Sequence, residues 1–456
     1  MRRLFRTAVL LCVATTALAR QPPATLTGLA ILPADTLAEG PASGAWRHAD
    51  ALGVPQFPSQ PVQGVSSLWP SSVPGEWFAL ADNGFGTKLN SADYLLRIYR
   101  LAVDWGASDA AGQVTTRGFI QLADPDRRLA FPIARQSTAE RWLTGSDLDP
   151  ESMVRVSDGT FWIGDEFGPF LLHFAADGRL LDGPYEVPGL RSPDPPHLPA
   201  ADVGQQSAAT ARRSRGFEGL AHFGSDLYAA IESGAGPDAD TARIYEFSLE
   251  KRAFTGQSWG VPLANAAHAL TELVSLAGVA PDCTARFLAI ERDDGHGAAA
   301  KLKHVREIHL AGNSVVSHPV VDLLDIANPR QLGGHAVRFT FPFLTTEAVW
   351  ATERGELVLV NDNNYPAGGG RPGALRDHTE FIRLRLSSPL CGGWRHGHRE
   401  ACHQCPDRPW GEKGAPTDAQ QGWLVNCQPS GTFIQTVRNI ANRTAAWVAC
   451  LRPGRF

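Results

Sequence analysis

The sequence predicts an all-β fold, a β-propeller made of antiparallel blades. The first observation is a repeat: five segments each begin with a short apolar strand, turn back, and continue in a second strand that ends in a carboxylate. The second observation is a third strand after each carboxylate, in which polar and apolar residues often alternate. The third is that no long helical period separates the repeats. Repeated antiparallel units of this kind favour a propeller over a sandwich.

The first strand of each repeat is short, apolar and opened by a small or acidic residue. These strands are expected at residues 64–68, 151–154, 218–221, 272–276 and 347–350. The second strands all end in Asp or Glu, and they are expected at residues 77–82, 161–166, 227–232, 287–291 and 357–362. Turn residues such as Pro74-Gly75 and Asp158-Gly159 lie between the two strands, as a hairpin requires. The third strands are expected at residues 95–101, 170–174, 242–247, 305–310 and 381–386.

The spacing between the opening residue and the carboxylate is 14 or 15 positions in three repeats and 18 or 19 positions in the other two. Fourteen residues separate Glu151 from Asp165, and the same number separates Glu218 from Glu232. This spacing fits two short strands joined by a tight turn.

The number of blades follows less directly from the sequence. Five repeats are visible, and we expect six blades, with the sixth in the irregular stretch from residue 104 to 150. Residues 25–32 also resemble a strand. We expect this strand to pair with the last blade, which would close the ring and remove an exposed edge.

The composition describes a folded chain without a basic surface. Of 456 residues, 43% are hydrophobic and 20% charged, which excludes a disordered protein. Lys and Arg number 42 against 47 Asp and Glu, a formal net charge of -5. This balance disfavours a nucleic-acid partner. The sequence does not fix an oligomeric state.

Residues 1–19 have the pattern of a cleavable secretory signal. Arg2 and Arg3 precede an apolar run, and Ala17-Leu18-Ala19 forms a small-x-small cleavage site. The apolar run is shorter than the roughly 20 residues that a membrane span needs, and no other stretch is long enough. We therefore expect a secreted or periplasmic protein with no integral membrane segment after signal removal.

The domain of repeats is expected to span residues 24–388, followed by a short cysteine-containing tail at 389–456. In an oxidising compartment, disulfides are expected among some of the remaining cysteines. A small zinc site made by His396, His398, Cys402 and Cys405 is a weaker alternative. The cysteines outside the signal are Cys283, Cys391, Cys402, Cys405, Cys427 and Cys450.

The recurring carboxylates predict a metal site. A single Asp or Glu at a strand end is usually a turn residue, but one in each repeat of a propeller brings like charges together. Such a cluster stays ionised mainly when cations lie within it, and ligands that are all oxygen suit Ca²⁺. The expected calcium ligands are Asp82, Asn83, Glu151, Glu218, Glu232, Glu291, Glu347, Asp362 and Asn363.

Two further groups of residues complete the predicted site. Asp165 and Glu166 are the expected catalytic residues, and Glu166 is a candidate general base, although the sequence does not separate a base from a ligand. Four basic residues are expected to balance the charge of the substrate. They are Lys88, Lys301, Lys303 and Arg371.

These motifs also resemble the phytase-like family that is described as having esterase-like activity. The resemblance spans about residues 62–386. It rests on Asp82-Asn83-Gly84-Phe85-Gly86, Asp149-Pro150-Glu151-Ser152, Gly164-Asp165-Glu166-Phe167-Gly168, Arg215-Gly216-Phe217-Glu218-Gly219, Glu291-Arg292-Asp293-Asp294 and Asn361-Asp362-Asn363-Asn364-Tyr365-Pro366. It implies a propeller similar to the calcium-dependent phytases and a phosphoesterase role.

The predicted function is that of a calcium-dependent hydrolase of small phosphate esters. One alternative is a metal-dependent esterase or lactonase, which would use the same carboxylates. Another is a non-enzymatic binding propeller in which calcium is purely structural. A serine esterase is disfavoured because no Ser-His-Asp set stands out in the sequence. The sequence also has no Gly-x-x-x-x-Gly-Lys-[Ser/Thr] phosphate loop, no His-Glu-x-x-His and no dinucleotide fingerprint in a strand–helix context.

Overall fold

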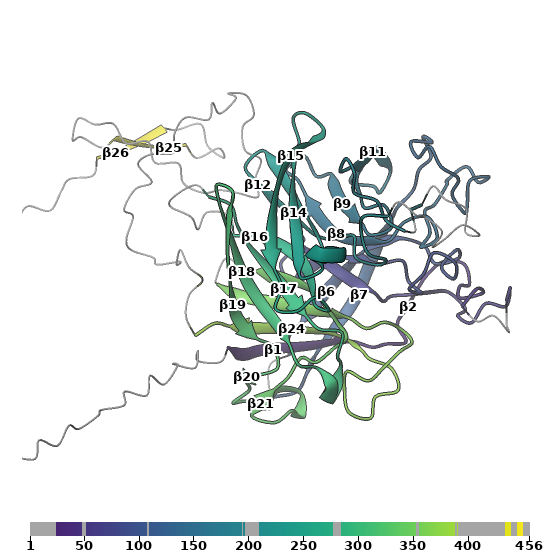
Figure 1. Cartoon of the computed structure of the whole chain (residues 1–456). Helices are drawn as coiled ribbons and strands as arrows, with labels where there is room; N and C mark the ends of the chain where they lie inside the picture. Colours follow the sequence, from purple (N-terminus) through teal and green to yellow (C-terminus); the bar gives the residue numbers. More distant parts are fainter. Residues whose placement is uncertain are drawn as a thin grey trace, which may run out of the picture. The chain divides into compact units, whose positions relative to one another are not determined.

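The computed structural model describes residues 24–47, 52–106, 109–193, 195–196, 209–276, 284–352, 355–387 and 390, and two strands near the C-terminus. In these residues the regular structure consists of strands and three-residue 3₁₀ turns, without an α-helix (Figure 1). The prediction of an all-β fold is therefore confirmed. The predicted signal and all six cysteines outside it lie outside the described residues.

Three of the sheets are four-stranded antiparallel meanders in chain order. The first contains β8 (Pro150–Arg155), β9 (Phe161–Asp165), β10 (Phe170–Phe174) and β11 (Leu180–Glu186). The second contains β12 (Phe217–Phe223), β13 (Asp226–Ile231), β14 (Thr241–Ser248) and β15 (Ala253–Pro262). The third contains β16 (Ala269–Ser275), β17 (Arg286–Arg292), β18 (Lys303–Ala311) and β19 (Ser314–Asp322).

The largest sheet contains two more meanders. One consists of β4 (Val65–Pro70), β5 (Glu76–Ala81), β6 (Arg97–Asp104) and β7 (Gly112–Gln121). The other consists of β22 (Thr345–Ala351), β23 (Glu356–Asp362), β24 (Thr379–Arg385) and β1 (Thr25–Leu32). A short parallel pairing of β1 with β7, at Ala30 and Ile31, joins the two.

Strand β1 completes the last meander from the other end of the chain. It pairs antiparallel with β24, from Thr25 opposite Arg385 to Leu32 opposite Thr379. The prediction that residues 25–32 pair with the last repeat is confirmed. Because β1 covers the free edge of β24, that edge offers no open ladder of backbone groups to another chain.

The five meanders follow one another in a closed cycle. Their first strands, β4, β8, β12, β16 and β22, each contact the first strand of the next meander, and β22 contacts β4. Five clusters of buried apolar side chains lie between neighbouring meanders. Leu80 and Ile98, for example, share one cluster with Ile163 and Phe170. The hydrophobic core is therefore divided among the interfaces of the cycle.

The expected sixth repeat is not found in the described part of the stretch from 104 to 150. After β7, this stretch contains only isolated bridges, such as Leu95 with Thr144 and Ala123 with Trp142. Asp124 and Asp147 organise it instead, since each accepts backbone N–H groups of the loop. In the sequence, an irregular loop held by polar side chains shows the same scattered apolar residues as a weak repeat would. The prediction of a sixth blade was wrong for this reason.

Short pairs of strands complete the description. β2 (Leu37–Ala38) pairs with β3 (Gln60–Pro61), and β20 (Ile326–Ala327) pairs with β21 (Arg338–Phe339). In the tail, β25 (Ile434–Arg438) pairs with β26 (Ala445–Ala449) as part of a separate unit, residues 407–456. The described part of the chain has no apolar helix of a length that would span a bilayer.

Candidate functional site

A β-bulge interrupts each of the five first strands at the same place. The pairing register shifts between Val65 and Ser67, Pro150 and Ser152, Phe217 and Gly219, Thr271 and Val274, and Thr346 and Ala348. A bulge leaves a residue unpaired and re-aims its side chain, and bulges are frequent beside active sites. The residues in the bulges are Ser66, Glu151, Glu218, Glu272 with Leu273, and Glu347.

A second acidic position follows from the same pairing. The residue before each bulge pairs with a residue near the end of the second strand, and the next residue of the chain is always acidic. These five residues are Asp82, Glu166, Glu232, Glu291 and Asp362.

The register corrects the equivalence that the spacing indicates. Pro150 pairs with Asp165 and Phe217 pairs with Ile231, so Glu166 is the counterpart of Glu232. The spacing of 14 that these two repeats share matches Asp165 to Glu232 instead. It is wrong by one residue because the hairpin between β8 and β9 is one residue longer than that between β12 and β13.

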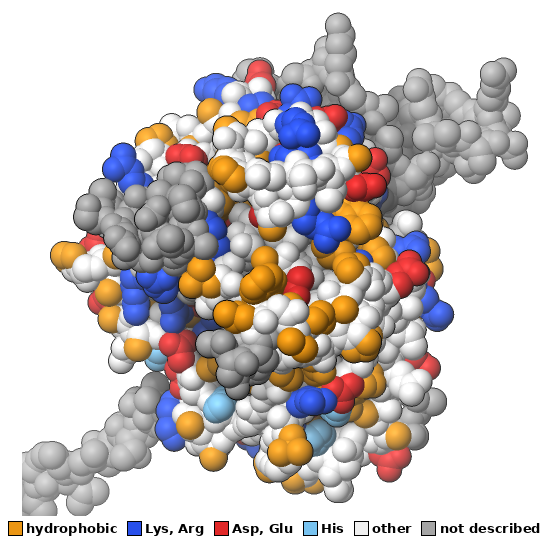
Figure 2. All heavy atoms as spheres, turned by 90° about the vertical axis from the view of Figure 1, so that its right-hand side faces the viewer, with side chains coloured by type: hydrophobic (Ala, Val, Ile, Leu, Met, Phe, Trp, Pro, Cys, Tyr) orange, Lys and Arg blue, Asp and Glu red, His pale blue; other side chains and the backbone are white. Residues whose placement is uncertain are grey.

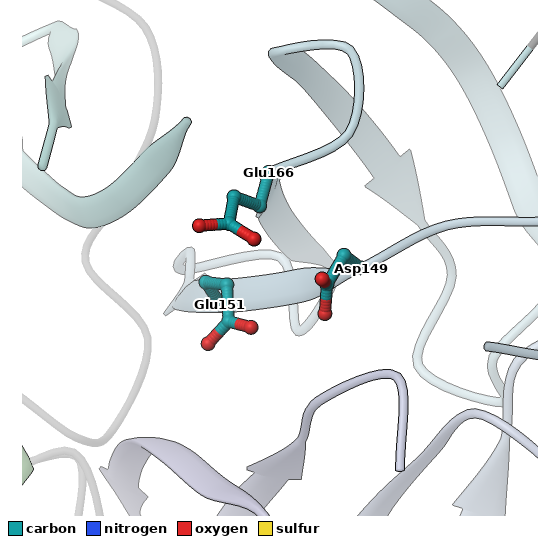
Figure 3. A group of neighbouring side chains, drawn as sticks. All are labelled: Asp149, Glu151 and Glu166. Carbon is teal, nitrogen blue, oxygen red and sulfur yellow. The ribbon is translucent and has the colours of Figure 1, made fainter. Parts of the chain in front are cut away.

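Two overlapping groups of carboxylates form the centre of the candidate site. Asp149, Glu151 and Glu166 have carboxylate oxygens within 4.8 Å of one another, and so do Glu166, Glu218 and Glu232. Figure 3 shows the first group, with Asp149 just before β8, Glu151 on β8, and Glu166 beside them just after β9. All five residues are buried. Glu166 belongs to both groups, so it occupies the middle of the site.

Three more carboxyl groups, two of them buried and that of Asp82 half-buried, interact electrostatically with these five. The eight residues are called the acidic cluster below: Asp82, Asp149, Glu151, Glu166, Glu218, Glu232, Glu347 and Asp362. The structure thus brings together six of the nine predicted calcium ligands, and one of the two predicted catalytic residues, at one place. Asp149 was not among the predicted ligands, and its signal in the sequence is its position two residues before Glu151.

Burial of the acidic cluster perturbs its proton affinity. Burial raises the pKa of Glu151, Glu166 and Glu218 well above their usual value, and neighbouring carboxylates raise it further. Burial, with a contribution from Asp362, raises the pKa of Glu347 to about 8. Burial raises the pKa of Asp362 to about 6, opposed by the N–H of Asn364. Without cations among them, these groups therefore keep their protons to higher pH than exposed carboxyl groups do.

Asp149 is held in place by two other predicted site residues. Its oxygens accept hydrogen bonds from the backbone N–H of Asn83 at 3.1 Å and from Asn83 Nδ2 at 2.6 Å. Its own N–H donates to Asp165 Oδ1 at 2.7 Å, and Asp165 Oδ2 accepts from the N–H of Gly168 at 2.6 Å. Asp165 belongs to neither carboxylate group. Asn83 and Asp165 thus position Asp149 and the loop after Glu166.

Asn363 and Glu291, both predicted ligands, have other partners. Asn363 Oδ1 accepts the N–H of Gly64 at 3.4 Å, and its Nδ2 donates to the carbonyl of Asp377 at 3.2 Å. Glu291 accepts from the N–H of Ala264 at 2.6 Å and lies 2.9 Å from His268 Nδ1. It also pairs with Arg306. The β16–β19 meander therefore adds no carboxylate to the acidic cluster.

The same meander contributes a cation instead. Arg292 lies 2.8 Å from Glu232 and 3.5 Å from Glu347, and Arg215 lies 2.7 Å from Glu232. Both arginines also pair with Asp294. The sequence reasoning missed these two as site residues, although each is next to or near a recognised Glu. By contrast, Glu218 Oε2 is buried without a hydrogen-bond partner among the described residues.

The four predicted substrate-binding cations do not meet at the acidic cluster. Lys303 Nζ donates to the carbonyls of Asp293 at 2.6 Å and Leu344 at 3.0 Å. Lys88 donates to the carbonyls of residues 195 and 196. Arg371 pairs with Glu380, and Lys301 is exposed. Buried Lys and Arg side chains that bind carbonyls serve the fold, and the sequence cannot distinguish this use from substrate binding.

A pocket of about 300 Å³ lies beside the acidic cluster and shares Asp82 with it. Asp82 Oδ1 accepts the N–H of Gly84 at 2.8 Å. On the face shown in Figure 2, acidic, basic and hydrophobic side chains are interspersed. The pocket is lined by Arg47, Gln63, Asp82, Gly84, Phe85, Gly86, Asn364, Tyr365, Pro366 and Ala367.

Comparison with known proteins places the chain in a family. The model of the phytase-like family, described as esterase-like activity of phytase, matches residues 60–365. The chain belongs to this family, and the resemblance noted in the sequence is confirmed. An uncharacterized secreted protein of Arthroderma benhamiae is 31% identical over 113 residues. This match spans 22% of either chain, so it reaches about a fifth of the relative's length.

Solved structures show only a loose likeness. A GH43 beta 1,3 galactosidase has a TM-score of 0.37 at 10% identity, covering 75% of this chain and 94% of its own. An alpha-L-arabinanase of Cellvibrio cellulosa has a TM-score of 0.32 at 11% identity, covering 55% of this chain and 76% of its own. With scores this low, neither a fold nor an activity follows from them.

Proposed function

We propose that this chain is a secreted, calcium-dependent hydrolase of phosphate esters, built on a five-bladed β-propeller. The observation that carries the proposal is the pair of buried carboxylate groups that share Glu166. The family adds support, since its description names an esterase-like activity of phytase. Secretion is supported by the signal pattern of residues 1–19 and by the name of the fungal relative.

The propeller accounts for the topology of the chain. Five antiparallel meanders whose first strands contact one another in a cycle correspond to five blades around a central axis. Strand β1 then closes the ring by completing the last blade. In this arrangement the bulges of the first strands lie near the axis, which explains how carboxylates far apart in the sequence meet.

The donor set of the acidic cluster fits calcium. The carboxylates of the two overlapping groups are buried, and Glu218 Oε2 has no hydrogen-bond partner in the described chain. Burying ionised carboxylates is costly unless cations neutralise them, and carboxylate oxygens without soft ligands suit Ca²⁺. Asp149, Glu151 and Glu166 would hold one ion, and Glu166, Glu218 and Glu232 a second. When bound, calcium would supply Lewis-acid polarisation of a phosphoryl oxygen and activation of a water.

The side chains of the chain itself supply the remaining functions. Asp82 belongs to the acidic cluster and also lines the pocket, so it is the carboxylate placed to take a proton from an attacking water. Its Oδ1 accepts from Gly84, which leaves Oδ2 as the proton acceptor. Arg292 and Arg215 fix Glu232 and offset part of the negative charge.

The experiment measures hydrolysis of a phosphomonoester, a phosphodiester, a carboxylic ester and a lactone. Each is tested with the purified chain before chelation, after chelation and after calcium is restored. We expect phosphatase activity that chelation abolishes and calcium restores, and that Glu166→Gln removes, because Glu166 belongs to both carboxylate groups. The matched control Glu250→Gln changes an exposed turn residue and should leave the rate unchanged.

The other outcomes identify the alternatives. Turnover of the carboxylic ester or the lactone alone would establish a metal-dependent esterase or lactonase on the same site. Loss of thermal stability on chelation, with no turnover of any of the four substrates, would establish calcium as a structural ion. Activity that persists after chelation would contradict the role of calcium.

A further inference from the structure

Glu272 is the one glutamate of the five bulges that does not belong to the acidic cluster. It is 1% exposed, and both oxygens of its carboxyl group accept hydrogen bonds. Oε2 accepts from Ser67 Oγ at 3.0 Å, and Oε1 accepts from the N–H of Leu273 at 3.2 Å. A carboxyl group that already satisfies donors of the protein is poorly placed to bind an ion. Glu272 therefore has a different role from the other glutamates of the bulges.

The hydrogen bond between Ser67 and Glu272 crosses the cycle of meanders. Ser67 lies on β4 of the first meander, and Glu272 lies on β16 of the fourth. In the cycle, the first meander lies between the second and the fifth, and the fourth lies between the third and the fifth. The two meanders are thus not neighbours. In the proposed propeller, a bond between them spans the central axis.

The bulge of β4 lets two consecutive hydroxyl groups reach carboxyl groups of different meanders. Consecutive side chains of a regular strand point to opposite faces, but the bulge at Ser66 interrupts this alternation. Ser66 Oγ donates to Glu347 Oε2 at 3.3 Å, while Ser67 Oγ donates to Glu272. Ser67 Oγ also accepts the N–H of Met153, on β8, at 3.2 Å. Four of the five first strands, β4, β8, β16 and β22, are joined in this way.

The fifth of these strands, β12, makes room for Glu272. A Cβ atom on Gly219 would lie 2.8 Å from Leu273 Cβ and 2.9 Å from the carbonyl carbon of Glu272, so only glycine fits there. Glu272 itself has a φ of +50°, which residues with a side chain rarely adopt. Such a backbone costs energy and persists only where its surroundings hold it in place. The contacts of the Glu272 side chain supply that hold.

We propose that Glu272 is a positioning residue for the acidic cluster. By holding β4 from across the cycle, it keeps Ser66 on Glu347 and keeps β8, which carries Glu151, in place. The carboxylates then have their positions before an ion binds, and less has to be ordered on binding. The inference rests on the proposed function, because it takes calcium as the ion, and it adds the residue that fixes the geometry of the site.

The first test compares Ser67→Ala with Ser152→Ala by calorimetric titration of the purified chain with calcium. Ser152 is the matched control: it also follows the bulge of its strand, is equally buried and donates to the carbonyl of Phe217 in the next meander at 3.0 Å. Only Ser67→Ala removes the bond across the cycle. We expect calcium affinity to fall about fivefold in Ser67→Ala and by less than about twofold in Ser152→Ala. Urea titration in chelator verifies that both variants are folded.

A second pair of variants separates the hydrogen bond from the charge. The amide oxygen of glutamine can still accept from Ser67, so Glu272→Gln should keep calcium affinity within about threefold of the unchanged chain. Glu272→Ala removes the acceptor and should weaken calcium binding about tenfold or more. Equal weakening in the two variants would indicate that the charge of Glu272 is needed, as for an ion ligand, and would overturn the proposal. Affinity that neither variant changes would overturn it as well.

Hydrogen exchange in the presence of chelator tests the inference without calcium. The N–H of Leu273 donates to Glu272, which Ser67 holds. Ser67→Ala should therefore speed exchange of this N–H about fivefold, and Ser152→Ala should leave it unchanged. Equal exchange in both variants would overturn the inference even in a chain that binds calcium. The expected difference in a chain that binds no calcium would support the link across the cycle and refute the proposed calcium-dependent hydrolase.

Discussion

Arg292 has an unusual position for an arginine, because it lies among the buried carboxylates of the acidic cluster. Its side chain is 7% exposed and pairs with Glu232, Glu347 and Asp294. The corresponding residues of the other repeats are Asn83, Phe167, Ser233 and Asn363, none of which is charged. The site therefore combines one internal cation from the fourth meander with acidic residues from the other four, and calcium would neutralise the remainder.

Replacing Arg292 by glutamine should destabilise the calcium-free protein. Removing one partner of a buried ion pair leaves the other charge uncompensated, which costs about 3–5 kcal/mol. We expect the free energy of unfolding from urea titration to fall by about that amount, and added calcium to restore part of it. Arg376→Gln is the control: Arg376 pairs with Asp35 at the surface, where such pairs contribute about 0–1 kcal/mol. An equal loss of unfolding free energy in both variants would show that Arg292 stabilises the protein no more than a surface arginine does.

At the scale of elements, two features build the site. The bulges place the side chains of Glu151, Glu218 and Glu347 off the regular ladder, toward the acidic cluster. Strand β1 joins the beginning of the chain to its last meander. A four-stranded meander buries its apolar faces only against its neighbours, so the closure by β1 affects the whole cycle.

Shortening a buried side chain of β1 should therefore have a large effect on stability. Leu29 is 1% exposed and belongs to the core between the fourth and fifth meanders. Leu29→Ala should lower the free energy of unfolding by about 2–5 kcal/mol, because it leaves a cavity. Leu37→Ala, at a position that is 39% exposed in the short strand β2, should change it by less than about 1 kcal/mol. A mild effect at Leu29 would mean that β1 is dispensable for closure.

At the scale of the molecule, the buried acids connect stability to pH. Burial raises the pKa of Asp147 from 3.8 to about 6, that of Asp165 from 3.8 to about 8 and that of Glu347 from 4.5 to about 8. The folded protein thus binds protons that the unfolded chain releases. This contribution is fully present below about pH 4 and is lost as the pH rises through the folded-state values.

The calcium-free protein should therefore unfold at lower urea concentration at pH 8 than at pH 5.5. Saturating calcium should reduce this difference, because the cations replace the protons as partners of the carboxylates. Urea titrations at the two pH values, with chelator and with calcium, provide the measurement. A midpoint that rises with pH in the presence of chelator would contradict the burial of these groups as acids.

The sequence by itself determined the β class, the strands and the acidic residues, because these depend on local pattern. Alternation and turn residues mark the hairpins, and carboxylates at strand ends are visible one repeat at a time. Six of the predicted ligands and Glu166 meet as expected. The motifs Asp82-Asn83-Gly84 and Glu218-Gly219 also led to the correct family.

Only the tertiary structure decided which of these residues share a site. Glu291 has the same place in its repeat as Glu232, yet Arg306 and His268 bind it away from the acidic cluster. Lys303 is a buried structural cation, whereas Arg292 enters the site. The direction in which a side chain points, its burial and its partners depend on neighbouring meanders that are distant in sequence. For that reason, a pattern within one repeat identifies a carboxylate but does not determine whether the fold leaves it free to bind an ion.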